Sequence, residues 1–430
     1  MHNFFLGILK YILKKLAQAT LWRYHPGLVG ITGSAGKTSA KEAVKVVLAR
    51  DRRVRASRGN FNNEIGLPLT ILGDWGEIPN PLFWLKVVLV SLLRLISPFK
   101  MPYPEILILE YGVDKPHDMD YLLRIARPSI AVVTAIGEVP VHVEFFSGPE
   151  ALAREKAKLV NQLPSIGFAV LSADDVSVVE MRNETRAHVI TYGFSEKAEM
   201  IISGFENRSS NWIPLGLGFK LEYGGAVIPV KLDGIFGKSQ AYSAAAASSL
   251  GLIFGMNLVK IAEALADYKP PNGRLKLLGG VKESFILDDT YNASPVSMHT
   301  ALETLRDLKA KRKVAILGDM LEIGKYSPEA HEATGRIAAK IADLIVTVGP
   351  RAKFIAEAAR ESGFKRDHIY SFSISDEAKK PVESLIKSGD LILVKGSQAM
   401  RMEKIVKEIM AEPDRARELL VRQSPSWQRR

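Results

Sequence analysis

The sequence predicts an α/β protein with a central domain built on a mostly parallel sheet and a Rossmann-like C-terminal α/β domain. An apolar, strand-like run at 28–32 enters a glycine-rich turn, and a helical apolar pattern follows at 39–48. Apolar runs that end at polar turns then alternate with helical stretches along the chain, as parallel strands do. A stretch rich in Pro and Gly at 268–280 separates the two halves.

The turn after the first strand has the composition of a phosphate-binding loop (P-loop). It contains Gly33, Ser34, Ala35, Gly36, Lys37 and Thr38, and Ser39 follows. Glycines let successive backbone N–H groups curl toward a phosphate, and the helix adds its positive N-terminal end. Lys37 would reach the β- and γ-phosphates of ATP, and the Thr38 hydroxyl would ligate Mg²⁺. The motif G-x-x-x-x-G-K-[ST] is matched except at Ile31, so a nucleotide triphosphate site is favoured over a chance GKT in an ordinary turn.

Composition limits the class of partner without choosing one. The 430 residues predict two or three domains, and the net charge of +11 suits anionic substrates, anionic lipid or nucleic acid. Nucleic acid is not expected, because the chain has no zinc finger or RNA-binding signature. The absence of cysteine excludes disulfides and thiolate metal sites and fits a reducing compartment, so we expect a cytoplasmic protein.

Residues 4–22 predict a basic amphipathic helix. The apolar face would hold Phe5, Ile8, Leu9, Ile12, Leu13 and Leu16, and the opposite face Lys10, Lys14 and Lys15. Such a helix either lies on a membrane or packs on the protein's own surface.

A second apolar stretch, 81–99, approaches the length of a membrane span. The runs at 28–32 and 105–110 flank it and should share one sheet, so a single crossing of a bilayer is excluded. We expect a buried or an interfacial helix here. Together with residues 4–22 it could give the protein peripheral contact with the inner face of the membrane.

The remaining elements follow in order. Parallel strands are expected within 129–137 and 167–175, an antiparallel patch within 188–234 and a helix at 239–255. Four strand-like runs then alternate with helical stretches, which is typical of a doubly wound domain: SFILDDTY, KVAILGDM, DLIVTVG and DLILVKGS. The charged residues from about Glu412 onward are expected to fray. The expected divisions are 1–27 (amphipathic helix), 28–270 (ATP-binding central domain), 271–412 (C-terminal domain) and 413–430 (charged tail).

Three further residues are candidates for the site. Glu110 ends a buried strand, which is where α/β folds place ligands. His142 follows the strand run at 129–137, and Lys156 lies in a helical stretch. Taken singly, His142 would be a packed or solvated histidine and Lys156 a solvent-facing lysine.

Considered together, these residues resemble a known family. The motifs are GITGSAGKTSAKE (30–42), NFNNEIGLPLTIL (60–72), LILEYG (107–112), VHVEFFSGPEALAREKAK (141–158), NGRLK (272–276), DDTYNASPVSM (288–298), ILGDMLEIG (316–324) with His331, and LVKGS (393–397). Their order and spacing resemble the Mur ligases over roughly residues 28–410. Within that family the likeness is closest to the branch that adds D-alanyl-D-alanine to a UDP-N-acetylmuramoyl-tripeptide.

The resemblance implies an ATP-dependent ligase of peptidoglycan precursor synthesis that works through an acyl phosphate, with Mg²⁺ as cofactor. It implies catalytic roles for Lys37, His142 and Lys156, and a Mg²⁺ site at Thr38 and Glu110. A second Mg²⁺ would be held by His142 and by Lys156 after its carbamylation. The implied ATP-binding residues are the P-loop residues with Ser39, together with Arg274, Asp289 and Asn292. The implied substrate-binding residues are Asn60, Asn62, Asn63, Tyr291 and His331. The substrates would be a UDP-muramyl peptide and D-Ala-D-Ala, and we expect a monomer.

The chain departs from the family at several positions. Ala135, Ser239, Gln240 and Ser243 stand where the family usually has other residues, and these positions bear on adenine binding. The UDP-binding domain that usually precedes the P-loop is expected to be missing, with the basic helix in its place. Two rival readings follow. One is a Mur-type ligase acting on a membrane-linked or non-UDP carboxylate, and the other is a nucleotide-binding scaffold without catalysis, against which Lys37, Glu110, His142 and Lys156 argue.

Overall fold

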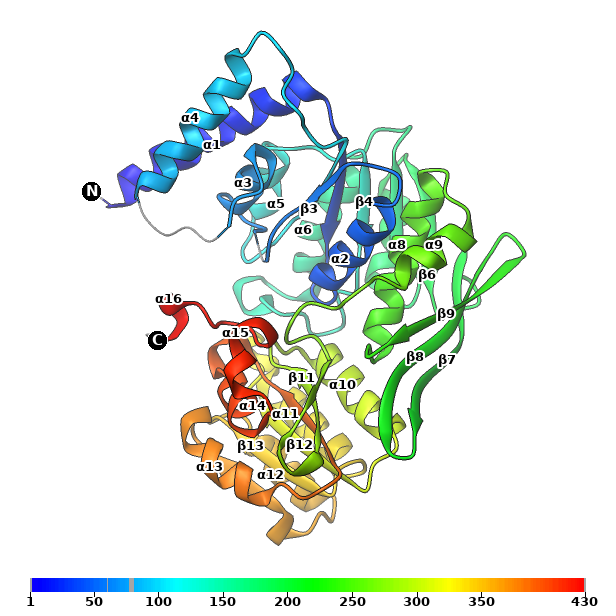
Figure 1. The fold of residues 1–430 in the computed structure, drawn as a ribbon, viewed down its shortest axis with the longest axis vertical. Coiled ribbons are helices and arrows are strands. Elements are labelled where there is room, and N and C mark those ends of the chain that lie inside the picture. Colours follow the sequence, from blue (N-terminus) through cyan, green and yellow to red (C-terminus); the bar gives the residue numbers. More distant parts are fainter. Residues whose placement is uncertain (1, 60, 77–80, 429–430) are drawn as a thin grey trace.

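The computed structural model describes residues 2–59, 61–76 and 81–428. Figure 1 shows two α/β bodies stacked along the long axis, with the N-terminal half of the chain above and the C-terminal half below. The upper body is built on a nine-stranded sheet and the lower one on a six-stranded sheet. Residues from both halves of the chain line the space between the two bodies.

The nine-stranded sheet has the order β2-β3-β1-β4-β5-β6-β7-β8-β9. Its strands are β1 (Gly27–Thr32), β2 (Val54–Ala56), β3 (Ile106–Glu110), β4 (Ile130–Val133), β5 (Phe168–Ser172), β6 (His188–Gly193), β7 (Met200–Ser210), β8 (Ile213–Tyr223) and β9 (Ala226–Asp233). All neighbours through β7 pair in parallel, and β8 and β9 are antiparallel. The antiparallel patch expected within 188–234 is therefore found, but β6 belongs to the parallel part.

The register of the central strands brings the P-loop and Glu110 together. Strand β1 pairs with β3 in parallel, with Ile31 opposite Glu110, and with β4 on its other side. The prediction that the runs at 28–32 and 105–110 share one sheet is confirmed. Parallel neighbours end at the same sheet edge, so the loop after β1 and the side chain that ends β3 lie next to each other.

Helices cover both faces of this sheet. The upper body contains α1 (His2–Tyr24), α2 (Lys37–Leu48), α3 (Gly66–Leu72), α4 (Pro81–Ile96), α5 (Asp118–Leu123), α6 (Pro149–Asn161), α7 (Val176–Val179), α8 (Lys238–Ile253) and α9 (Leu258–Leu265). Buried side chains of α2, α8 and α9 pack on one face, and those of α3, α5, α6 and α7 on the other. Period-two alternation in β1 sends Val29 and Ile31 to the α2 side.

The six-stranded sheet has the order β10-β11-β15-β12-β13-β14, and only β10 is antiparallel to its neighbour. Its strands are β10 (Lys276–Gly279), β11 (Phe285–Asp289), β12 (Arg312–Gly318), β13 (Leu344–Val348), β14 (Ile369–Phe372) and β15 (Asp390–Lys395). Its helices are α10 (Pro295–Asp307), α11 (Ser327–Ala338), α12 (Lys353–Glu361), α13 (Ser375–Leu385), α14 (Glu403–Ile409), α15 (Ala416–Leu419) and α16 (Pro425–Gln428). Helices α10–α12 cover one face and α13–α15 the other. The four predicted strands are present, and β10 and β14 were missed.

The two N-terminal apolar segments form helices that pack beside each other, with α3 beneath them (Figure 1). Leu13 and Leu16 of α1 share a buried cluster with Val87 of α4. The predicted division of α1 into two faces is wrong in part. Ile8 and Ile12 are exposed, whereas Lys10 turns to Glu64 at 2.5 Å. The lysine stems can pack along the protein while their charged ends find partners, which a simple helical-wheel reading does not anticipate. Phe5 lies outside the residues whose side chains are described.

Helix α4 is not a buried helix, because only one side of it packs against the protein. Val87 and Ser91 are buried, but Leu82, Leu93 and Ile96 are exposed. No helix among the described residues is long and apolar enough to cross a membrane. The expectation of a fully buried helix is therefore wrong for this segment.

The C-terminal residues are packed, which corrects the expectation that they fray. The Arg422 side chain is 6% exposed and donates to Glu403 Oε2 at 2.8 Å. It also donates to the backbone carbonyls of Thr290 and Tyr291 in the loop after β11. The charge pattern alone could not reveal this, because Glu403 lies 19 residues earlier in the chain and the two carbonyls lie more than a hundred residues earlier.

Arg422→Ala should lower the free energy of unfolding by about 2–4 kcal/mol, because a buried carboxylate and two carbonyls each lose a donor. Urea denaturation measures this value, and Arg417→Ala, on an exposed side chain of the same segment, is the matched control. Equal stability of the two variants would show that the segment contributes nothing to the fold.

Candidate functional site

The P-loop joins the end of β1 to the start of α2. Gly33 has φ of 141° and Gly36 has φ of 86°, backbone conformations that side chains with a Cβ rarely adopt. A Cβ on Gly33 would also lie 2.0 Å from Thr134 Oγ1. Both glycines are thus required by the turn that aims the helix N-terminus into the space between the two bodies.

Not all the loop amides point to a ligand. Ser34 and Ala35 donate their N–H groups to the Ala135 carbonyl at 2.9 and 3.0 Å. Helix α2 begins at Lys37 without a side-chain cap, so its first N–H groups remain available for an anion. The Ser34 hydroxyl is buried without a hydrogen-bond partner, which is an observation that fits a phosphate in this loop.

A buried carboxylate lies directly beside the loop. Glu110 is 2% exposed, and its Oε2 lies 3.5 Å from Thr38 Oγ1. Asn62 donates to Oε1 at 3.4 Å, so the loop that follows residue 60 also reaches this group. Carboxylate and hydroxyl oxygens are the donors that Mg²⁺ prefers, and the pair fits one Mg²⁺ together with phosphate oxygens.

Lys41 is a member of this site that the sequence analysis missed. Its side chain is fully buried, with Nζ 3.4 Å from Glu110 Oε2 and donating to the Gly59 carbonyl at 2.6 Å. A buried lysine beside a buried carboxylate compensates its charge. The signal was available in the helical spacing, since Lys41 stands one turn after Lys37 and falls among the apolar positions of α2.

Lys37 and Lys156 have depressed pKa values. Burial lowers the pKa of Lys37, Glu110 opposes this effect and Arg274 adds to it. Burial lowers the pKa of Lys156 well below its usual value, and the nearby positive charge of Lys37 adds to the shift. Lys156 is 1% exposed, and no ion pair involves it among the residues the structure describes. It is therefore not the solvent-facing lysine that a surface helix would carry, and its burial disfavours the charged form.

His142 links the two bodies of the protein. Its Nε2 lies 3.3 Å from Asp114 Oδ1, and its Nδ1 lies 3.1 Å from Glu322 Oε2, in the loop after β12. The hydrogen bond from His142 lowers the pKa of Glu322. Asp114 and Glu322 were not predicted as site residues, and no local pattern distinguishes either from a surface acid.

The C-terminal body contributes a second group of charged side chains. The Arg274 guanidinium lies over the Tyr291 ring at 4.1 Å, and its Nε is buried without a partner. Asp289 accepts from Lys395 Nζ at 2.6 Å, and Lys395 also donates to the Asn292 carbonyl. Asp289 and Asn292 are therefore engaged within the protein, and Lys395 is a further buried cation that the sequence analysis did not assign.

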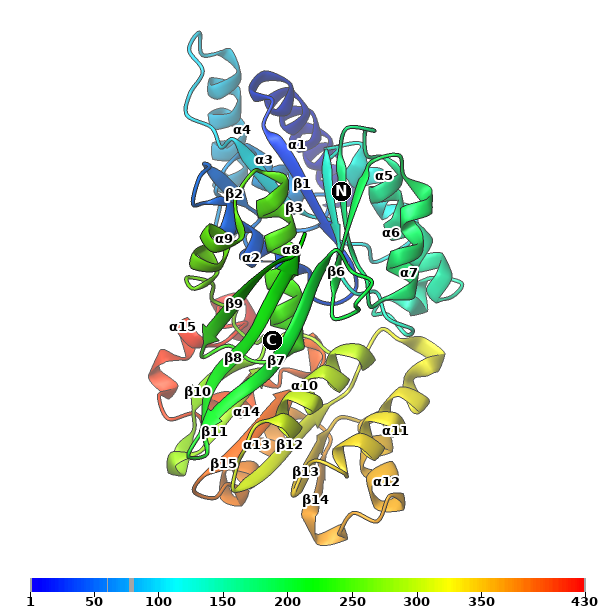
Figure 2. The ribbon, with the colours of Figure 1, turned by 90° about the vertical axis from the view of Figure 1, so that its right-hand side faces the viewer.

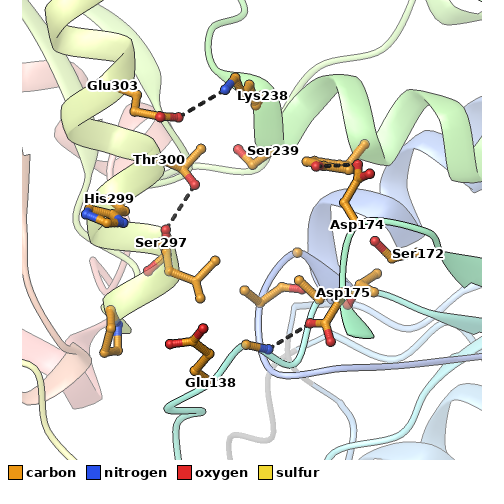
Figure 3. Close-up of a pocket in the computed structure, with 18 of the residues that line it drawn as sticks. Glu138, Ser172, Asp174, Asp175, Lys238, Ser239, Ser297, His299, Thr300 and Glu303 are labelled. Atoms are coloured by element: carbon orange, nitrogen blue, oxygen red, sulfur yellow. Dashed lines mark hydrogen bonds and ion pairs between the residues drawn. The ribbon is translucent and has the colours of Figure 1, made fainter. Parts of the chain in front are cut away.

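A cavity of about 830 Å³ opens between the bodies next to the P-loop. Figure 3 shows Asp174, Ser239 and Lys238 on the central side, and Ser297 and Glu303 on the C-terminal side. Lys238 pairs with Glu303 at 3.3 Å across this space. Ala35, Gly36, Arg274 and Asp289 also line it, so a nucleotide with its phosphates at the loop would extend into this cavity.

Gln240 and Ser243 of α8 do not offer free polar groups to that cavity. Gln240 is buried, donates to the Arg274 carbonyl at 3.1 Å and accepts from the Tyr268 hydroxyl at 2.7 Å. Ser243 donates to the Ser239 carbonyl at 2.9 Å. The hydrogen bond from Gln240 thus helps to hold the backbone at Arg274.

A smaller cavity of about 270 Å³ is lined by Asn62, whose side chain also contacts Glu110. Asn62 and Asn63 line it with Asp114 and with Lys10 from α1. Asn63 Oδ1 accepts from the amides of Ile65 and Gly66, so this side chain starts α3. Asn60, the first of the three predicted asparagines, lies outside the described residues.

His331 does not reach either cavity, which corrects its predicted role in binding substrate. The side chain is fully buried, its Nε2 accepts from the Met320 amide at 2.9 Å, and its Nδ1 lies 2.6 Å from the Ser327 carbonyl. Both ring nitrogens are used within the fold, and burial lowers the pKa of the ring. His331 holds the loop after β12, the loop that carries Glu322, against α11.

Few side chains at this site are arranged to bind a metal ion. Among the described residues, no three His, Asp or Glu side chains form a cluster that could hold a metal ion. Any Mg²⁺ must therefore draw on the Thr38 hydroxyl, phosphate oxygens or a modified side chain besides Glu110 and His142.

The chain was also compared with known proteins. Residues 90–250 match the Mur ligase middle domain, and residues 273–398 match the glutamate ligase domain of Mur ligases. The UDP-N-acetylmuramoyl-tripeptide--D-alanyl-D-alanine ligase of Bacillus subtilis is 30% identical over 93% of this chain and 79% of its own length. The enzyme of the same name from Treponema pallidum is 30% identical over 88% of this chain and 73% of its own length.

Solved structures give the same result. The MurF ligase from Thermotoga maritima in complex with ADP superposes with a TM-score of 0.76 and 27% identity, over 93% of this chain and 83% of that one. A MurF from Acinetobacter baumannii, at 24% identity, shares the fold with a TM-score of 0.75 over 92% of this chain and 79% of that one. The two domain matches and the 30% identity to the Bacillus subtilis enzyme over most of both chains show that the chain belongs to the Mur ligase family.

Proposed function

We propose that this protein is an ATP-dependent amide ligase that joins D-Ala-D-Ala to the terminal carboxylate of a UDP-N-acetylmuramoyl-tripeptide in peptidoglycan precursor synthesis. The observation that carries the proposal is the convergence of Lys37, Thr38 and Glu110 with the buried Lys156 at the junction of the two bodies. The relatives that act on these substrates match over most of the chain.

The reaction would proceed in two steps that balance. The substrate carboxylate attacks the γ-phosphorus of ATP, giving an acyl phosphate and ADP. The free amine of D-Ala-D-Ala then attacks the acyl carbon, an amide bond forms, inorganic phosphate leaves, and the amine gives up a proton. Phosphorylation is needed because a carboxylate oxygen is a poor leaving group.

The residues have separate roles in this proposal. Lys37 and the uncapped N-terminus of α2 stabilise the negative charge that gathers on the transferred phosphoryl group. Arg274 would approach the same phosphates from the C-terminal body, and Tyr291 supports its guanidinium. Residues 28–270 would thus hold ATP, and residues 271–412 would close over it. Both walls of the cavity come from one chain, so we expect a monomer to be active.

Mg²⁺, when bound at Thr38 and Glu110, would neutralise phosphate charge. A second ion would use His142 and Lys156, but a lysine can ligate Mg²⁺ only after modification. The Lys156 amine, when unprotonated, can add to CO₂, which forms a carbamate with loss of one proton and converts the side chain into an anionic oxygen donor. The burial that depresses the pKa of Lys156 is what keeps its lone pair available.

A second substrate class has one observation in its favour. Helix α1 contributes Lys10 to the smaller cavity beside Asn62, where the carboxylate substrate would lie. A muramyl peptide linked to a membrane carrier in place of UDP would undergo the same two steps. Parallel assays with UDP-linked and lipid-linked muramyl peptides would distinguish the two, since only the preferred donor should give product at low concentration.

The purified protein should form an amide product with release of ADP only when ATP, Mg²⁺, the muramyl peptide and D-Ala-D-Ala are all present. Lys37→Ala should reduce kcat by about 10²–10³-fold or more, because it removes a charge from the transferred phosphoryl group. Mass spectrometry of the product and coupled detection of ADP measure both effects. The matched control is Lys45→Ala on the exposed side of α2, and unchanged turnover in Lys37→Ala would exclude the P-loop assignment.

Lys156→Ala should lose activity and recover part of it when short-chain carboxylates such as acetate are added, because they can replace the carbamate oxygen. The recovery should depend on carboxylate concentration and be absent in Lys37→Ala. Incubation of the unmodified protein with ¹³C-labelled CO₂ should also give a carbamate signal in the NMR spectrum that Lys156→Ala lacks. A wild-type rate in Lys156→Ala would show that the buried amine is structural.

A further inference from the structure

Exposed apolar side chains are concentrated on one part of the surface. Twelve of the 22 large hydrophobic side chains that are exposed in the described residues belong to α1, to α4 or to the segment 97–104 that follows. Scattered exposed leucines need no explanation, but a concentration on two neighbouring helices indicates an interaction surface.

Helix α4 contributes a continuous stripe to this surface. Leu82, Leu85, Leu89, Leu92 and Ile96 follow one another at intervals of three and four residues, and all are exposed. The opposite side of the helix carries the buried Val87 and Ser91. The helix is thus apolar on both sides, and only one side has a partner in the protein.

Helix α1 widens the stripe. It packs beside α4 through Leu13 and Leu16, and it exposes Ile8, Tyr11 and Ile12 (Figure 1). In the view of Figure 2 both helices stand at the end of the molecule away from the C-terminal body. The surface they form can therefore meet a large flat partner without obstructing the cavity between the bodies.

The charges that these two segments themselves contribute have one sign, although Lys10 of α1 pairs with Glu64 at 2.5 Å. The sequence has no acidic residue in 1–41 or in 78–104. Lys15, Lys86 and Lys100 are exposed beside the apolar side chains. Apolar residues that can insert and lysines that can bind phosphate groups together match the interface of an anionic bilayer.

We propose that the α1–α4 surface docks reversibly on an anionic lipid bilayer. Helix α4 has 16 residues, about 24 Å of helix, which is shorter than the roughly 30 Å of a hydrocarbon core, so it would lie along the interface. A second copy of the chain fits this surface less well. Pairing two copies would bring the lysines of both together with no carboxylate from these segments to compensate them.

The inference does not rest on the proposed ligase activity. Lipid binding is measured without nucleotide or peptide, and ligation of water-soluble substrates is measured without lipid. A negative result in either the lipid-binding or the ligation experiment would therefore not contradict the other proposal.

The test is co-sedimentation of the full-length protein with vesicles made of equal parts phosphatidylcholine and phosphatidylglycerol, compared with phosphatidylcholine alone. Binding should be strong only with the anionic vesicles and should weaken when salt is raised from about 0.1 M to about 1 M, which shortens the Debye length from about 10 Å to about 3 Å. Leu89→Glu should reduce the partition coefficient by roughly tenfold or more, and Lys86→Glu by about fivefold or more.

Matched controls are Val259→Glu, on an exposed apolar residue of α9, and Lys197→Glu, on an exposed lysine far from α4 in the chain; both should bind like the wild type. Circular dichroism should show all four variants folded. Equal loss in Val259→Glu and Leu89→Glu would overturn the proposal. The proposal would also be wrong if the wild-type protein did not bind anionic vesicles at low salt. A dimer in sedimentation equilibrium that Leu89→Glu dissociates, with no binding to vesicles, would overturn it in favour of a second copy of the chain.

Discussion

The buried Glu110 carboxylate is the group on which the arrangement of the site depends. A charge removed from water at the end of a central strand is costly unless other groups compensate it. Lys41 supplies the opposite charge, while Thr38 approaches from the first turn of α2 and Asn62 from the loop before α3. The parallel register of β1 and β3 fixes where the carboxylate lies relative to the phosphate loop. The need to compensate the buried Glu110 charge therefore links the strand pairing, the position of α2 and the other charges of the site.

The same logic extends across the junction of the two bodies. His142 stands between Asp114 and Glu322, one carboxylate from each side, and Arg274 brings a cation toward Lys37. Lys395 of the second body is paired with Asp289, so this lysine adds no net positive charge to the junction. Anionic ligands between the bodies would change this balance, and the relative position of the bodies is expected to respond to them.

Local patterns were sufficient for part of this structure. The P-loop and Glu110 follow from a strand, a turn and a strand end, each readable within about ten residues. His142 and Lys156 were identified only through a family resemblance, because nothing local separates them from ordinary surface residues. Glu322 and Lys395 were missed because their partners come from other elements, whereas Lys41 was overlooked although its place among the apolar positions of α2 could have revealed it. The strands β10 and β14 are four residues long, too short for periodicity to reveal them. The lysines of α1 illustrate a further limit, since amphipathicity does not say which side of a helix the rest of the protein will cover.

The order of strands in the second sheet has a consequence for how the protein is made. Strand β15 is the last strand of the chain, yet it lies between β11 and β12 and pairs with both. During synthesis, β11 and β12 are made well before β15, the strand that pairs with both of them. The second sheet can close only after β15 has been synthesised, and the residues around Arg422 come later still. Until then, the apolar faces of β11 and β12 are exposed, and this interval is when the nascent chain is most open to aggregation or to capture by chaperones.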